Sequence, residues 1–133
     1  MSIGKQSAYA VLTLRLSLGI LFIAHALLKV VVFTLPGTVL FFDGVGIPGF
    51  LAYPVFAIEL VAGILLIAGL YTRWASLAVV PVMIVATMVH WPNGWVFTNA
   101  GGGWEFTAFL AAAAFGLFLQ GEDGAASLSA HRE

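Results

Sequence analysis

The chain has 133 residues and a net charge of -1, and 62% of its residues are apolar while only 8% are charged. So few polar side chains cannot cover the surface of a soluble domain, and the composition therefore indicates an integral membrane protein. The sequence has no basic run or stripe, which argues against nucleic-acid binding. It also has no cysteine, which excludes disulfides, thiol redox chemistry and cysteine-ligated iron–sulfur or zinc sites.

Four apolar blocks alternate with turn-like sequence, at about 8–33, 53–70, 74–91 and 104–119. Each comes near the ~20 residues that a helix needs to cross a ~30 Å hydrocarbon core, the last block being the shortest. Lipid offers the backbone no hydrogen-bond partners, so an open chain crosses it only as helix. We therefore expect one transmembrane domain over residues 1–133, an all-α antiparallel four-helix bundle with a polar tail at 120–133.

The segment between the first two blocks, LPGTVLFFDGVGIPGFLA, combines chain breakers with bulky apolar residues. Its prolines and glycines interrupt it too often for a span, yet its phenylalanines make it too apolar for a solvated linker. We expect a short interfacial or re-entrant segment that packs on the mouth of the bundle.

The few cationic residues near the ends of the blocks indicate an orientation. Lys5, Arg73 and Arg132 fall on one side of the expected bundle, and the connections on the other side hold no lysine or arginine. Because cytoplasmic loops are enriched in these residues, we expect both termini on the cytoplasmic side of the cell membrane. Arg15 and the length of the first block favour a spanning helix there over a cleaved signal peptide.

The first block carries an ionisable stripe. At about 100° per residue, Arg15, Leu18, Phe22, His25 and Lys29 fall within an arc of roughly 80° on one helix face. A charge at membrane depth costs a few kcal/mol, so such residues usually face the interior of a bundle and find partners there. The stripe predicts a polar interior surface.

The expected topology gathers ionisable groups from all four blocks in the outer half of the membrane. By helical rise, His25, Glu59 and Lys29 lie about 12, 9 and 6 Å below the outer end, while His90 ends the third block and Glu105 begins the fourth. These positions predict a candidate ligand pocket able to exchange protons. No catalytic residue and no metal ligand set is assigned.

Arg15 and His25 each leave two alternatives open. Arg15 can form a structural ion pair with Glu59, where Gly63 would let the first helix approach closely, or it can snorkel to the inner interface. His25 can hydrogen-bond within the bundle or ligate a metal or haem.

Several segments together resemble the DoxX family of small four-helix membrane proteins. They are RLSLGILFIAHALLK, FFDGVGIPG, AIELVAGILLIAGLYTRWAS, MVHWPNG, GGGWEF and the C-terminal GEDGAASLS. One departure is Ala26, where the family often has glycine. The family includes the quinone-reducing membrane subunit of thiosulfate:quinone oxidoreductase, so the resemblance implies quinone or quinol as a ligand. It marks Arg15, His25, Lys29, Glu59, His90 and Glu105 as family-like polar positions.

Three hypotheses of function follow. The first is a membrane subunit of a quinone-linked oxidoreductase system; no redox centre is evident in the sequence, so electrons would come from a partner subunit or a bound cofactor. The second is a non-enzymatic membrane scaffold, or a protein that binds a lipid or small apolar molecule. The third is a haem protein with His25 and His90 as axial ligands, against which their depths count, differing by about 10 Å. The alanines at 111–114 offer a smooth face for packing, within the subunit or in a homodimer.

Overall fold

The computed structural model describes residues 2–120, and the expected polar tail from residue 121 onward lies outside these residues. The described chain is all-helical. Its α-helices are α1 (Ile3–Leu27), α2 (Leu35–Gly44), α3 (Ala52–Ala68), α4 (Thr72–His90) and α5 (Glu105–Gln120). A π-helical turn, Leu28–Val32, extends α1, and 3-10 turns at Gly49–Leu51 and Trp91–Asn93 adjoin α3 and α4.

Within residues 2–120, three helical stretches are long and apolar enough to cross a membrane. They are Ile3–Val32, Gly49–Ala68 and Thr72–Asn93. The fourth apolar block forms α5, whose 16 residues give a length of about 24 Å. The chain is therefore a membrane protein with three full-length candidate spans and one shorter apolar helix.

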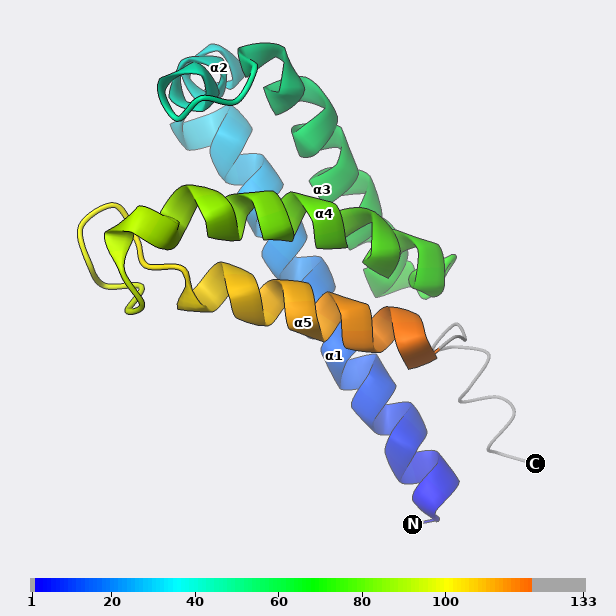
Figure 1. Ribbon diagram of the computed structural model, residues 1–133. Helices are drawn as coiled ribbons and strands as arrows, with labels where there is room; N and C mark the ends of the chain where they lie inside the picture. Colours follow the sequence, from blue (N-terminus) through cyan, green and yellow to red (C-terminus); the bar gives the residue numbers. More distant parts are fainter. Residues whose placement is uncertain (1, 121–133) are drawn as a thin grey trace.

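The helices form two antiparallel pairs. In Figure 1, α1 runs beside α3, and the α4–α5 hairpin lies across this pair. The N-terminal end of α1, the α3–α4 connection and the C-terminal end of α5 all lie toward the right of that view. α2 and the α4–α5 connection lie on the left. We call the end at which α1 ends and α3 begins the outer end, following the expected orientation.

The connection between α3 and α4 is a tight turn. Gly69 ends α3 at φ 76°, and the N–H groups of Gly69 and Leu70 both donate to the carbonyl of Leu65. Tyr71 then adopts φ 50° and precedes the first residue of α4. Glycine suits this left-handed conformation because it has no Cβ, so the turn fixes α3 and α4 as antiparallel neighbours.

Two glycines let α1 and α3 touch through their backbones. A Cβ at Gly19 would lie 2.9 Å from the carbonyl oxygen of Gly63, and a Cβ at Gly63 would lie 2.9 Å from that of Gly19. Each added Cβ would also meet an isoleucine side chain, Ile67 or Ile23. This contact confirms that Gly63 allows the close approach of α1, as small residues do in membrane helix pairs.

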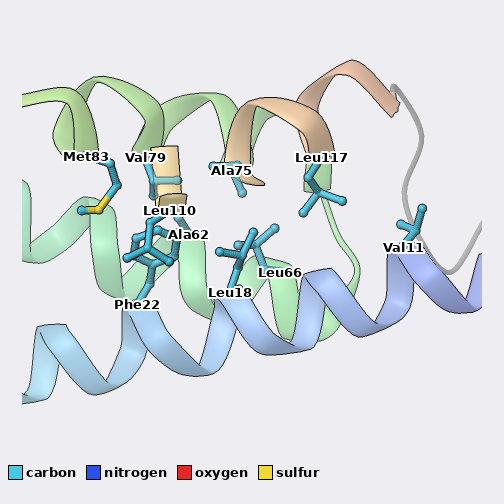
Figure 2. Close-up of a cluster of buried hydrophobic side chains, with 11 residues drawn as sticks. Val11, Leu18, Phe22, Ala62, Leu66, Ala75, Val79, Met83, Leu110 and Leu117 are labelled. Carbon is cyan, nitrogen blue, oxygen red and sulfur yellow. The ribbon is translucent and has the colours of Figure 1, made fainter. Parts of the chain in front are cut away.

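The apolar core lies where the two helix pairs cross. Its buried side chains come from α1, α3, α4 and α5, and most of them are seen in Figure 2. They are Val11, Leu18, Phe22, Ala62, Leu66, Ala75, Val79, Met83, Leu110, Ala114 and Leu117. Because all four helices contribute, the core holds the two pairs together.

The segment after the first span contains a helix that the sequence analysis did not predict. Its 10 residues, Leu35–Gly44, form α2, which at about 15 Å is too short to cross the membrane. Pro36 and Gly37 do not break the helix because they stand in its first turn, where the N–H that proline lacks is not needed for a bond within the helix. Thr34 caps this turn by accepting the N–H of Gly37 at 3.1 Å.

Candidate functional site

A polar layer begins where the apolar core ends, on the side of the outer end. The last core side chains, shown together in Figure 2, are Phe22, Ala62, Met83 and Leu110. One helical turn further outward, every one of these helices carries a polar residue. These residues are His25, Glu59, Thr87 and Thr107. The layer therefore combines positions that are distant in the sequence.

Lys29 and Glu59 form a salt bridge across α1 and α3. The Lys29 Nζ atom lies 2.8 Å from Oε1 of Glu59, and the two side chains are 18% and 2% exposed. A buried charge needs a charged or hydrogen-bonding partner because its desolvation costs several kcal/mol. The pair thus connects the outer ends of the two helices, and it leaves Lys29 as the more accessible member.

The second carboxylate oxygen of Glu59 has a different environment. Oε2 is buried, and among the described residues no donor lies within hydrogen-bonding distance of it. An ionised carboxylate accepts through both oxygens, and a buried acceptor without a donor costs about 1–3 kcal/mol or more. Glu59 therefore has one oxygen held by the protein and one that can accept a hydrogen bond from another molecule.

The backbone around Lys29 is unusual. Residues Leu28–Val32 form a π-helical turn, in which the N–H of Phe33 donates to the carbonyl of Leu28 at 2.9 Å. Such turns insert a residue into the helical repeat and occur often at functional sites. The next residue, Thr34, has φ 65° and ψ 156°, a region that branched residues rarely adopt. The end of α1 therefore departs from regular helix at the residues that flank the salt bridge.

His25 lies one turn before Lys29 and faces α5. Its Nδ1 is 2.8 Å from the carbonyl oxygen of Leu21, so Nδ1 carries the hydrogen and donates it. Its ring packs against that of Phe106 with 6.0 Å between the centroids. In the neutral ring, Nε2 is then an acceptor, which gives the layer a second acceptor besides Oε2 of Glu59.

Arg15 contacts the backbone at the end of α3. It is 5% exposed, and its Nε donates to the carbonyl of Leu66 at 2.6 Å while a terminal nitrogen lies 3.4 Å from that of Ile67. These carbonyls end α3, so the guanidinium caps the negative end of that helix dipole.

The ion pair that the structure shows for Glu59 is not the Arg15–Glu59 pair that the sequence left open as one alternative. The partner of Glu59 is Lys29, while Arg15 lies at the far end of α3. About 20 Å of helical rise separates Arg15 from Lys29 on α1, and Glu59 belongs to the level of Lys29. The guanidinium contacts carbonyls at the end of α3 that is the inner end in the expected orientation.

His90 and Glu105 hold the connection between α4 and α5. The Nδ1 atom of His90 lies 3.1 Å from the carbonyl oxygens of Gly101 and Gly102, and Glu105 Oε1 accepts the N–H of Phe97 at 3.3 Å. Around them three indoles pack together: Trp104 stacks on Trp91 and meets Trp95 edge-on. The contacts of His90 and Glu105 are thus with this connection, whereas Lys29 and Glu59 contact each other.

Thr87 and Thr107 are polar members of the layer that the sequence analysis missed. The hydroxyl of Thr87 lies 2.8 Å from the carbonyl of Met83 and 3.0 Å from the hydroxyl of Thr107. A search for ionisable ligand-site residues does not reveal them, although both threonines stand one turn from core positions. Their helical spacing from Met83 and Leu110 was the available signal.

The described residues offer no metal site of the usual kind. Within residues 2–120, no group of three or more histidine, cysteine, aspartate or glutamate side chains is placed to hold a metal ion. Two apolar grooves are open at the surface of the described residues. One, of about 330 Å³, lies between α4 and α5 and is lined by Ile84, Thr87, Met88, Trp91, Ala108 and Ala111.

Comparison with known proteins gives a family and one curated relative. The DoxX family model matches residues 10–91, which contain Lys29 and Glu59 but neither Thr107 nor Glu105. A Bacillus subtilis protein named "Putative oxidoreductase CatD" is 38% identical over 85 residues, covering 64% of this chain and 58% of the relative. The alignment thus spans less than two thirds of that protein. No solved structure matches.

Proposed function

Because the chain belongs to the DoxX family, we propose that it is the membrane component of a quinone-linked oxidoreductase system. In this proposal α1, α3, α4 and α5 form the expected four-helix bundle in the cell membrane, with both termini cytoplasmic. The polar layer around Lys29 and Glu59 binds a quinone or a similar small apolar ligand.

The observation that carries the proposal is the salt bridge with its remaining hydrogen-bonding capacity. Lys29 Nζ uses one contact on Glu59 Oε1 and, as an ammonium, has further N–H donors for a ligand oxygen. Glu59 Oε2 and the His25 ring supply acceptors. Donors and acceptors at membrane depth fit a flat apolar ring that carries two oxygens, as carbonyls in the quinone or as hydroxyls in the quinol.

The surroundings of these residues suit a ligand that arrives from lipid. Lys29 is the more exposed member of the pair, so the approach lies on its side. The apolar groove between α4 and α5 includes Thr87 of the polar layer and can accommodate an alkyl or isoprenoid chain. A quinone head group would therefore be held by α1 and α3 while its chain remains in an apolar environment.

The proposal assigns binding and proton exchange to this chain, not electron donation. The sequence contains no cysteine and no evident nucleotide-binding fingerprint. Electrons would come from a partner subunit or a bound cofactor. The name of the Bacillus subtilis relative supports an oxidoreductase association.

Quinone binding to the purified chain in lipid nanodiscs tests the proposal. A short-chain quinone should quench tryptophan fluorescence saturably in the wild type. The double variant Lys29→Met/Glu59→Gln should bind at least about tenfold more weakly, because it removes the charge-assisted donor of Lys29 without leaving an unpaired charge.

Glu105→Gln is the matched control, since its side chain serves the α4–α5 connection and keeps a carbonyl oxygen for the N–H of Phe97. It should bind quinone like the wild type. Equal quinone affinity in the wild type and the folded double variant would refute the proposal.

A further inference from the structure

The polar layer offers a ligand acceptors from Glu59 and His25 and donors from Lys29. Oε2 of Glu59 belongs to a side chain that is 2% exposed, and no described residue donates to it. The ammonium of Lys29 lies 2.8 Å from Oε1, so the carboxylate is one half of an ion pair. A charged carboxylate cannot donate, so whatever reaches Oε2 has to bring a hydrogen.

His25 supplies a second hydrogen-bond acceptor. Its Nδ1 hydrogen is taken by the carbonyl of Leu21 at 2.8 Å, which leaves Nε2 of the neutral ring as an acceptor. The hydroxyls of Thr87 and Thr107 already donate within the protein. The donors left for a ligand come from Lys29, and an ammonium can donate equally well to a carbonyl oxygen or to a hydroxyl oxygen. Discrimination between ligands therefore depends on Glu59 and His25.

A quinone and its quinol differ in this property. The oxidised ring has two carbonyl oxygens, which only accept, whereas the reduced ring has two hydroxyls, which donate and accept. Resting on the proposed function, we propose that this site selects the reduced, hydroxyl-bearing form of its ligand. One hydroxyl donates to Oε2 of Glu59, and its oxygen lies within the donor range of Lys29.

The physical reason for selection is the cost of an unmet acceptor. A hydroxyl that reaches Oε2 supplies the hydrogen bond that this buried oxygen lacks among the described residues, whereas a quinone carbonyl leaves it without a donor. Sites built to hydrogen-bond a ligand hydroxyl reject analogues that lack it. The π-helical turn and the 18% exposure of Lys29 mark the side from which the hydroxyl enters.

Three ring compounds of one skeleton separate the alternatives: a short-chain naphthohydroquinone, its quinone and its dimethyl ether. Binding to the wild-type chain in nanodiscs is measured under argon, so that the hydroquinone stays reduced. The hydroquinone should bind at least about tenfold more tightly than either of the others, as expected for one hydrogen bond to a charged acceptor.

The variant Glu59→Gln tests the acceptor directly. A glutamine amide can turn either its N–H₂ donor or its carbonyl oxygen to the ligand, so the preference for the hydroquinone should fall below about threefold. Glu105→Gln serves as the control and should keep the wild-type preference. If Glu59→Gln does not fold, the three-compound comparison on the wild type still decides.

The outcomes also distinguish this inference from the proposed function. Equal affinity for hydroquinone and quinone, or tighter binding of the quinone, overturns the selection of the reduced form and leaves quinone binding intact. Failure of all three compounds to bind overturns both.

Discussion

Arg15 and Lys29 stand on the same face of α1, about 20 Å apart along its axis, and both carry a charge into the apolar part of the molecule. Arg15 donates to backbone carbonyls at the end of α3. Lys29 pairs with a side chain, Glu59, one oxygen of which receives no hydrogen bond from the described residues.

We propose that this difference separates a structural contact from a ligand-binding site. A cap on helix carbonyls fixes where α3 ends relative to α1 and presents nothing to a ligand. The salt bridge at the outer end also joins the two helices, but it retains acceptor capacity beside a π-helical turn. Substitutions at the inner site should therefore change stability alone, and those at the outer site should change both stability and ligand binding.

The largest effect should come from Lys29→Met, which leaves the carboxylate of Glu59 buried without its cation. We expect a loss of about 3–5 kcal/mol in the free energy of unfolding. The double variant Lys29→Met/Glu59→Gln should recover most of that loss, because neither charge remains. Detergent-titrated unfolding in mixed micelles measures both. A single variant as stable as the double one would show that Glu59 does not depend on Lys29.

Arg15→Met should come next. Losing charged hydrogen bonds to the last carbonyls of α3 should cost about 1.5–3 kcal/mol, measured by the same unfolding titration. Arg15→Lys should fall between the two because it keeps the charge without the guanidinium geometry. Quinone affinity should stay at the wild-type value in both variants. Weakened quinone binding in a variant of normal stability would place Arg15 in the outer site after all.

Gly63→Ala tests the contact that lies between the two charged sites. Its Cβ would meet the carbonyl oxygen of Gly19 at 2.9 Å, so the helices must separate, at a cost of about 1–3 kcal/mol. Gly116→Ala is the control, since a Cβ there has nothing within 4 Å, and it should change stability by less than about 1 kcal/mol. Equal effects in the two variants would exclude a tight α1–α3 contact.

The smallest effect should be a gain. Thr34→Gly relieves the backbone strain of φ 65° and ψ 156° while losing a side-chain cap. Relief of about 1–3 kcal/mol against a capping loss of a few tenths predicts a net stabilisation of about 1 kcal/mol or more. The thermal midpoint in nanodiscs should rise. A lower midpoint would mean that the hydroxyl of Thr34 contributes more than its conformation costs.

The spans of this chain could be predicted because lipid imposes length and apolarity on a helix. The predicted blocks at 53–70 and 74–91 correspond to α3 (Ala52–Ala68) and α4 (Thr72–His90). α2 could not be predicted from the density of breakers alone. Its proline stands in the first turn of the helix, where the backbone N–H that proline lacks would have no partner within the helix.

The sequence predicted the depth of the candidate site's residues in the membrane, but it did not predict which side chains pair with each other. Helical rise placed Lys29 and Glu59 in one layer, yet which groups meet depends on rotation about the helix axis, and the π-helical turn alters that rotation. The contact of Arg15 with the end of α3 could not be predicted, because backbone carbonyls of another helix leave no mark in the sequence. The threonines were missed since an uncharged hydroxyl gives a weak signal in an apolar chain.

Photolabelling tests whether a quinone binds beside Lys29 and Glu59. An azido-quinone is bound to the wild-type chain in nanodiscs and irradiated, and the labelled peptides are identified by mass spectrometry, with excess unlabelled quinone as competitor. We expect labelling in the segment from His25 to Phe33 and in the part of α3 around Glu59, and we expect the unlabelled quinone to reduce it. Labelling confined to other segments, or labelling that the competitor does not reduce, would contradict this expectation.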